Sequence, residues 1–302
     1  MLRIKNLNKS YGNRKVLQNL TFNITSGEVY GLLGANGAGK TTTINIICNL
    51  LNADSGYITI NNQPISETTK KLIGIAPQEN LLYKTLSCAE NLQFFANIYG
   101  LNREMKKQQV EATLKAVNLL DRAKSPVETL SGGMQRRLNI AVALVHQPKL
   151  VILDEPTTGL DIEARYEIWD LIRQLKNQGM TILLTTHLLD EAERLCNKIG
   201  ILKNGQILAE GSLSELKTLI PGQEVLVLQT TQEEQAIALA QEYGFTTRRY
   251  GNDLAFLLPE PLELKDILAR FDGIPIDSIS RQPVRLEHIY VEITQAKYSH
   301  HT

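Results

Sequence analysis

Cysteine is scarce in this sequence, and its three copies are far apart: Cys48, Cys88 and Cys196. They form no Cys-x-x-Cys pair, and three scattered thiols are too few for a disulfide framework or for a thiolate zinc site. The sequence therefore excludes the small disulfide-rich secreted class and predicts a reducing, cytosolic environment.

A net charge is also missing, since 32 basic and 32 acidic residues balance to a formal charge of zero. Such a chain has no overall basic field to attract nucleic acid or acidic lipid, so we expect no nucleic-acid partner. The balance is uneven along the chain, because acidic residues outnumber basic ones after residue 220. This asymmetry indicates that the two parts differ in role.

Long apolar runs are absent as well. No run approaches the roughly 18 to 20 apolar residues needed to cross a bilayer, and the start, MLRIKNLNKSYG, lacks the apolar centre of a signal peptide. We therefore expect a chain that does not itself span a membrane. With 302 residues, of which 43% are hydrophobic, it is long enough for one large or two ordinary domains, which excludes disordered and fibrous classes.

The first two thirds of the chain alternate short β-rich runs with longer helical ones, as in an α/β domain with a largely parallel sheet. The clearest strands are apolar throughout, as expected for strands covered on both faces, at residues 28–33, 72–76, 150–153 and 181–185. The clearest helices span residues 40–49, 89–99, 104–117, 132–145 and 162–176. We predict one domain over residues 1–220, with a helical subdomain at about 85–146.

A second, smaller domain is expected over residues 221–302. Asn204 and Gly205 predict a hairpin with a type I′ turn that closes the first domain, and Pro221 marks the boundary. The rest follows the order strand, helix, strand, strand, helix, strand, helix, which approximates a split βαβ unit and predicts a small α+β domain with a ferredoxin-like fold. His300 and His301 fit a frayed end better than a metal site.

A glycine-rich loop joins the strand at residues 28–33 to the next helix. Its residues are Gly34, Ala35, Asn36, Gly37, Ala38, Gly39, Lys40, Thr41 and Thr42. This context is the one that a phosphate-binding loop requires, because backbone N–H groups can turn inward around a β-phosphate while Lys40 brings a charge near the β- and γ-phosphates. Thr41 is then expected to ligate Mg²⁺. The alternative is a glycine-rich loop with an exposed lysine.

Two adjacent acids end the buried strand at residues 150–153. Asp154 is expected beside the phosphate-binding loop, where it can hold Mg²⁺ through water. Glu155 is expected to face the γ-phosphate, where a carboxylate can orient and deprotonate the attacking water. The alternative is an acidic strand end that caps the helix at Ile162.

Ser131, Gly132 and Gly133 precede an amphipathic helix whose N-terminus suits an anion, although a Ser-Gly-Gly start is more often an ordinary N-cap. Spacing favours the functional interpretation. Ser131 lies 91 residues after Lys40 and 23 before Asp154, and a histidine, His187, follows 33 residues after Asp154 at the end of an apolar strand.

Together these motifs resemble those of the ATP-binding subunit of ABC transporters, over residues 1 to about 219. The resemblance implies a P-loop NTPase fold that binds ATP and Mg²⁺. It further implies that Tyr11 stacks on adenine, that Gln78 senses Mg²⁺ and the membrane subunit, and that residues 131–133 are the signature. Residues 158–161 look like the D-loop, and His187 looks like the switch histidine at the γ-phosphate.

The resemblance also implies partners. Two copies pack head to tail, and each ATP is clamped between Lys40 of one copy and Ser131 of the other, so we expect a homodimer whose clamp is released by hydrolysis at Glu155. A separate transmembrane permease subunit supplies the pathway, and residues 79–85 are expected to receive it. This would hold the chain at the cytoplasmic face of the plasma membrane.

The direction of transport is indicated by the signature and by the C-terminal residues. Met134 stands where most importers have glutamine, and an SGGM signature is similar to the drug-, lipid- and polysaccharide-exporter branch. Residues 283–293 resemble the tail of daunorubicin-exporter-like ATPases. We therefore predict an ATPase that powers export. The alternatives are an importer ATPase and a non-transport ABC ATPase that acts as a nucleotide-gated clamp.

Overall fold

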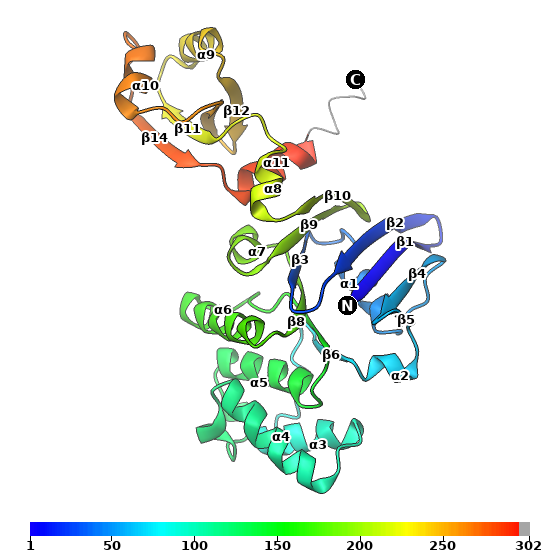
Figure 1. Ribbon diagram of the computed structural model, residues 1–302. Helices are drawn as coiled ribbons and strands as arrows, with labels where there is room; N and C mark the ends of the chain where they lie inside the picture. The colour runs from blue at the N-terminus through cyan, green and yellow to red at the C-terminus, as the bar shows by residue number, and fades with distance from the viewer. Residues whose placement is uncertain (296–302) are drawn as a thin grey trace. The chain divides into compact units, whose positions relative to one another are not determined.

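The computed structural model describes residues 1–295, so that His300 and His301 lie outside the described residues. The chain divides into two compact units, of which the first covers Met1–Glu210 and the second begins at Gly211 (Figure 1).

The centre of the first unit is a six-stranded sheet with the strand order β10-β9-β3-β8-β7-β6. The strands from β9 to β6 in that order pair in parallel with their neighbours. Their bounds are β3 (Val29–Leu33), β6 (Ile73–Ala76), β7 (Leu150–Asp154), β8 (Thr181–Thr186), β9 (Lys198–Lys203) and β10 (Gln206–Gly211). The four apolar strands and the hairpin that the sequence predicts are all found, and Asn204 and Gly205 in its turn both have positive φ.

The helices of the first unit are α1 (Lys40–Ile47), α2 (Glu67–Lys70), α3 (Cys88–Ile98), α4 (Arg103–Ala116), α5 (Gly132–Leu144), α6 (Ile162–Asn177) and α7 (Leu189–Leu195), with short 3₁₀ turns at Leu120–Arg122 and Val127–Thr129. Among them, α5 packs against β6, and α3 and α4 pack against α5. Along β7, Leu150 and Ile152 pack in the core that contains α1, whereas Val151 and Leu153 pack in the core that contains α5 and α6. Because successive side chains point to opposite faces, only a continuously apolar strand can serve both cores.

The first unit contains a second sheet, which the sequence pattern does not distinguish from the parallel one. It is antiparallel, with the order β2-β1-β4-β5 and the bounds β1 (Leu2–Tyr11), β2 (Arg14–Ile24), β4 (Ser55–Ile60) and β5 (Gln63–Pro64). Its apolar residues share one core with α1 and one face of the parallel sheet. The prediction of a largely parallel sheet therefore describes only one of the two sheets.

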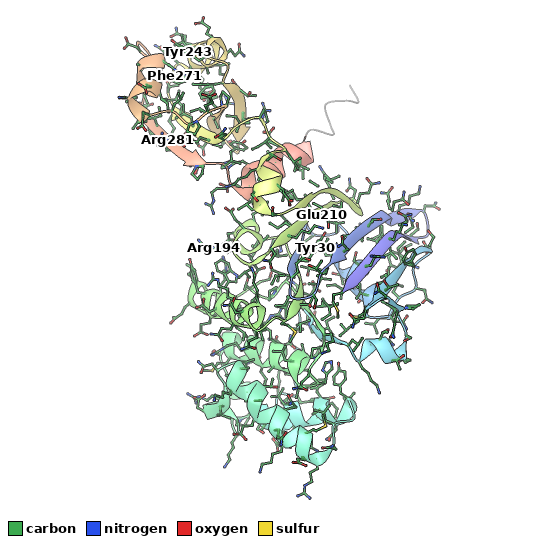
Figure 2. All side chains as sticks on the ribbon, viewed as in Figure 1. Tyr30, Arg194, Glu210, Tyr243, Phe271 and Arg281 are labelled. Atoms are coloured by element: carbon green, nitrogen blue, oxygen red, sulfur yellow. The ribbon has the colours of Figure 1, made fainter. Side chains whose placement is uncertain are left out.

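The second unit begins earlier than the boundary predicted near Pro221, because α8 (Leu213–Lys217) packs with α11 (Leu286–Gln295). Its antiparallel sheet has the order β12-β13-β11-β14. The other elements are β11 (Glu224–Gln229), α9 (Glu233–Glu242), β12 (Thr246–Tyr250), β13 (Asp253–Leu258), α10 (Leu264–Arg270) and β14 (Ser278–Pro283). Phe271 is buried in its core (Figure 2). This order agrees with the split βαβ arrangement expected from the sequence, and the ferredoxin-like assignment stays a prediction.

Gly74 in β6 marks a close approach of α5 to the sheet. A methyl group on Gly74 would lie 1.9 Å from the carbonyl oxygen of Ala143, which belongs to the main chain and cannot turn aside. We expect Gly74→Ala to lower the free energy of unfolding by roughly 1–3 kcal/mol. Urea unfolding followed by the fluorescence of Trp169, the single tryptophan, measures this change in the first unit.

The matched control is Gly132→Ala, because a methyl group there meets nothing within 4 Å. This variant should keep its unfolding midpoint or raise it slightly, since alanine favours a helix more than glycine does. An equal midpoint in both variants would contradict the close packing of β6 on α5.

Candidate nucleotide site

The glycine-rich loop joins β3 to α1, and Gly37 and Gly39 in it both have positive φ. Gly39 precedes α1 with φ 115°, which an L side chain rarely adopts, and a methyl group on it would lie 2.7 Å from Leu17. Lys40 is the first helical residue and is only 5% exposed, and its Nζ donates to the carbonyl oxygens of Gly34 at 2.7 Å and Ala35 at 3.3 Å. The loop thus presents donors and one buried cation at a helix N-terminus.

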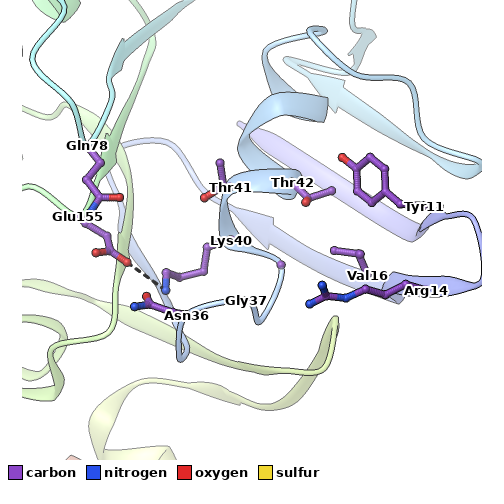
Figure 3. Close-up of a pocket in the computed structure, with 11 residues that line it drawn as sticks. Tyr11, Arg14, Val16, Asn36, Gly37, Lys40, Thr41, Thr42, Gln78 and Glu155 are labelled. Atoms are coloured by element: carbon purple, nitrogen blue, oxygen red, sulfur yellow. Dashed lines mark ion pairs between the residues drawn. The ribbon is translucent and has the colours of Figure 1, made fainter.

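A cavity of about 510 Å³ opens above this loop. Most of the nucleotide-binding residues predicted from the sequence line it, together with Arg14 and Val16 (Figure 3). The complete lining is Tyr11, Arg14, Val16, Asn36, Gly37, Gly39, Lys40, Thr41, Thr42, Gln78 and Glu155. Ala38 is an exception, because its side chain packs in the apolar core between the two sheets.

The sequence does not predict that Arg14 and Val16 line the site, because neither residue belongs to a recognisable motif. They line the cavity because the antiparallel sheet pairs Tyr11 with Arg14 across the turn between β1 and β2. Arg14 also approaches the loop, since its Nη2 lies 3.9 Å from the point where a methyl group on Gly37 would be. Only a prediction that β1 pairs with β2 could have indicated that Arg14 and Val16 line the pocket.

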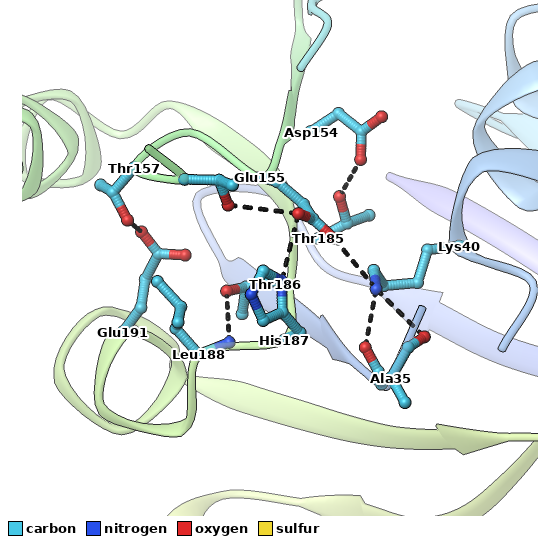
Figure 4. Close-up of polar contacts among 12 residues, drawn as sticks. Ala35, Lys40, Asp154, Glu155, Thr157, Thr185, Thr186, His187, Leu188 and Glu191 are labelled. Carbon is cyan, nitrogen blue, oxygen red and sulfur yellow. Dashed lines mark hydrogen bonds and ion pairs between the residues drawn. The ribbon is translucent and has the colours of Figure 1, made fainter. Parts of the chain in front are cut away.

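The two carboxylates at the end of β7 have different partners (Figure 4). Asp154 accepts a hydrogen bond from the Thr185 hydroxyl at 2.5 Å. Glu155 lies 3.1 Å from Lys40 Nζ through Oε1 and 3.1 Å from Nδ1 of His187 through Oε2. Glu155 has a positive φ of 46° and its N–H donates to the carbonyl oxygen of Thr185 at 3.0 Å, so the main chain turns the carboxylate toward the loop.

The pKa values of the two carboxyls are shifted in opposite directions, because burial and these partners oppose each other and a different one prevails at each carboxyl. Burial raises the pKa of Asp154 above its ordinary value, although the Thr185 hydrogen bond and the charges of Lys40 and Arg136 oppose the shift. Burial also acts on Glu155, but hydrogen bonds and charge from Lys40 and His187 outweigh it, so the pKa of Glu155 lies below its ordinary value. Glu155 is therefore ionised at neutral pH.

Three oxygen donors of the predicted metal set come from separate segments. The Thr41 hydroxyl and the Gln78 amide line the cavity, and the buried Asp154 carboxylate lies at the end of β7. Hydroxyl, amide and carboxylate oxygens suit Mg²⁺, which prefers hard ligands and retains several waters. Within residues 1–295, no three His, Cys, Asp or Glu side chains form a cluster that could hold another metal.

The signature residues lie outside this cavity. Ser131 is the N-cap of α5, and its Oγ accepts from the N–H of Met134 at 3.3 Å, so the N-cap that the sequence allows is present. Ser131 and Gly132 are exposed, whereas Gly133 is buried. The first turn of α5 is therefore a helix N-terminus that faces solvent rather than this chain's own pocket.

A glycine-rich loop at a helix N-terminus, a buried lysine and a carboxylate at the end of a neighbouring parallel strand define the class of P-loop nucleotide hydrolases. Comparison with known proteins narrows the class. The sequence model of the ABC transporter family matches residues 17–158.

Full-length relatives agree with the family match. The chain is 42% identical over 243 residues to the linearmycin resistance ATP-binding protein LnrL of Bacillus subtilis (strain 168), covering 80% of this chain and 78% of that protein. It is 36% identical over 297 residues to the Nod factor export ATP-binding protein I of Cupriavidus metallidurans, covering 97% of each. The chain therefore belongs to the ABC transporter family, in which it is an ATP-binding and ATP-hydrolysing subunit.

Solved structures support the same assignment. The structure of an ATP-binding subunit of an ABC transporter is 34% identical, with a TM-score of 0.65 over 72% of this chain and 92% of that one. A dimeric, post-hydrolysis cassette, MJ0796 bound to ADP and Pi, is 29% identical, with a TM-score of 0.63 over 70% of this chain and 98% of that one. The predicted P-loop NTPase fold and the ABC resemblance are thus confirmed. In the described part of the chain, no helix is both long and apolar enough to cross a membrane.

The ion pair of Glu155 should be visible in the acid stability of the chain. Because its folded-state pKa is below the unfolded value, its stabilising contribution is complete above about pH 4.3 and is lost as the pH falls through the folded-state value. We expect the difference in unfolding free energy between the parent and Glu155→Gln to be larger at pH 7 than at pH 3.5. For Glu104→Gln, which replaces an exposed carboxylate, the difference in unfolding free energy from the parent should be the same at both pH values. A difference that is independent of pH would contradict the assigned pairing.

Proposed function

We propose that this ATPase powers export of a drug-, lipid- or polysaccharide-like cargo through a membrane partner. The observation that carries the proposal is a pocket lined by predicted ATP-binding residues, in a chain that is similar over 97% of its length to a Nod factor export ATP-binding protein. A relative named for linearmycin resistance supports the same direction. Met134 in the signature agrees with it.

In this proposal, Lys40 and the main-chain N–H groups of residues 36–42 hold the phosphates of ATP, and Tyr11 stacks on adenine. Tyr11 is 51% exposed at the rim of the cavity, which suits a ring that gains its packing partner on binding. Glu155 orients and deprotonates the attacking water. His187, whose Nδ1 lies 3.1 Å from Glu155 Oε2, contacts the γ-phosphate.

Glu155 and the γ-phosphate of ATP would compete for the single positive charge of Lys40. The ion pair at 3.1 Å therefore implies an exchange, in which the phosphate takes over Lys40 and Glu155 is released to face the water. The fit of oxygen donors supports Mg²⁺ as the metal, held by Thr41, Gln78 and, through water, Asp154. When bound, the metal would neutralise charge on the β- and γ-phosphate oxygens.

A second copy of the chain completes each site. Because Ser131 and Gly132 are exposed and away from their own pocket, their helix N-terminus is free to receive the γ-phosphate of ATP bound by the other copy. ATP then bridges the two copies, and loss of the terminal phosphate separates them. Dimeric structures among solved cassettes of the family support this arrangement.

The permease is proposed to dock at residues 79–85, which hold the chain at the cytoplasmic face of the membrane. Large apolar side chains are exposed there and on α3, with Leu81 at 64%, Tyr83 at 47% and Phe94 at 37%. The rings of Tyr83 and Phe94 meet edge to face with centroids 4.7 Å apart. An exposed apolar cluster of this kind marks an interaction surface.

Dimerisation is testable with Glu155→Gln, which should bind ATP without hydrolysing it. We expect analytical ultracentrifugation to show a dimer with ATP and a monomer with ADP, because only the γ-phosphate bridges the copies. Lys40→Ala added to Glu155→Gln should abolish the dimer through loss of ATP binding. A monomer at saturating ATP would contradict the proposed clamp.

Docking is testable by crosslinking in native membranes. Tyr83→Cys should crosslink to an integral membrane protein, and Tyr57→Cys, which is similarly exposed on β4, should not. The proposed docking surface would be wrong if Tyr83→Cys reached no membrane protein while the chain still sedimented with membranes.

A further inference from the structure

Arg136 is a buried arginine that no motif of the sequence singles out. It lies on α5, five residues after the signature serine, and is only 4% exposed. Among the described residues, the hydrogen-bond partners of its guanidinium are all main-chain carbonyl oxygens. A buried cation paired with carbonyls rather than with a carboxylate holds main chain in place.

The carbonyls belong to two catalytic segments. Arg136 Nη1 donates to Pro77 at 2.5 Å and to Gln78 at 3.1 Å. The other nitrogens donate to the end of β7 and to the two residues after it, with Nη2 to Asp154 at 2.7 Å and to Glu155 at 3.1 Å, and Nε to Pro156 at 2.8 Å. One planar group therefore joins the Gln78 loop to the carboxylate segment.

The chemistry of arginine suits this position. Its rigid fork directs five N–H donors at once, whereas a lysine has three donors on a flexible stem. Burial lowers the pKa of Arg136 to about 10, so the side chain is still charged at neutral pH. Asn139, one turn further along α5, adds a hydrogen bond from its Nδ2 to the Pro77 oxygen at 3.0 Å.

The same helix carries the signature. Ser131 caps α5, and Arg136 follows about 7.5 Å along the axis, within one rigid element. The N-terminus of α5 meets the ATP of the other copy, as proposed above. Arg136 meets Gln78 and Glu155 of its own copy. A shift of α5 caused by one ATP must therefore act on the main chain around the other.

We infer that Arg136 is a positioning residue that couples the two ATP sites of the dimer, by joining the signature helix to the Gln78 loop and to the segment of Glu155. The inference rests on the proposed ATP-dependent dimer. Coupling of this kind needs a direct measurement, because contact alone does not establish it.

The experiment measures ATP hydrolysis against ATP concentration for the full chain and for Arg136→Met and Arg136→Lys. The parent should show a Hill coefficient above 1. Arg136→Met keeps a long side chain but no donors, so we expect a coefficient of 1 and a kcat about 10- to 100-fold lower. ATP binding to the monomer, measured with a fluorescent analogue, should stay within about twofold, because none of the hydrogen bonds of Arg136 is to the phosphate-binding loop. Arg136→Lys should recover part of both losses.

Arg137→Lys is the matched control. Arg137 is also buried on α5, but it contacts the Asn118 carbonyl oxygen at 3.3 Å and Glu167 at 3.5 Å, away from the catalytic segments. This variant should keep the parent Hill coefficient even if its melting temperature falls.

Three outcomes would overturn the inference: an unchanged Hill coefficient in Arg136→Met, an equal loss in Arg137→Lys, or weaker ATP binding as the whole cause of the lower activity. If Arg136→Met does not fold, Arg136→Lys alone decides, since it must lower the Hill coefficient without changing monomer binding. The proposed dimer itself would be overturned by a different result, namely Glu155→Gln that binds ATP but stays monomeric.

Discussion

The parallel alignment of β3, β8 and β7 is the constraint on which the site depends. These strands are adjacent, and because they run in the same direction their carboxyl ends meet at one edge of the sheet. The loop before Lys40 follows β3, Glu155 follows β7, and His187 follows β8. An antiparallel β7 of five residues would carry Glu155 to the opposite edge, roughly 15 Å away. Burial of both faces of the sheet stabilises the parallel order.

At that edge, low exposure makes an unpaired charge costly. The side chains of Lys40 and Glu155 are 5% and 7% exposed, and removal of one partner from a buried pair costs about 3–5 kcal/mol. The site therefore favours a state in which each charge has a partner. In the proposed exchange, the γ-phosphate would replace Glu155 at Lys40, so that Lys40 would keep a partner and Glu155 would keep His187 beside it. The same reasoning applies to Arg136, whose charge is compensated by carbonyl dipoles.

Several elements could be predicted from the sequence because their cause is local. Ser87 and Glu90, which follow the Ser-x-x-Glu pattern of a capping box, form one at the start of α3, and Asn204 and Gly205 form the expected turn. Asp161, rather than Asp154 or Glu155, caps α6 with its side chain, so the helix-capping alternative for the two acids does not account for them. The antiparallel sheet escaped prediction because the pairing that assembles it, between β1 and β4, joins segments far apart in the chain, whereas its two hairpins, β1 with β2 and β4 with β5, are local.

The residue types and spacings of the sequence determined the chemistry: a phosphate-binding loop, two acids after an apolar strand, and a Ser-Gly-Gly helix start. These features are local, because a turn, a helix N-terminus and a strand end each depend on neighbouring residues. Only the tertiary structure decided that Arg14 lines the pocket and that Arg136 joins two distant loops. Their roles arise from contacts between segments far apart in the chain, and such contacts leave no periodicity or spacing that could be read in advance.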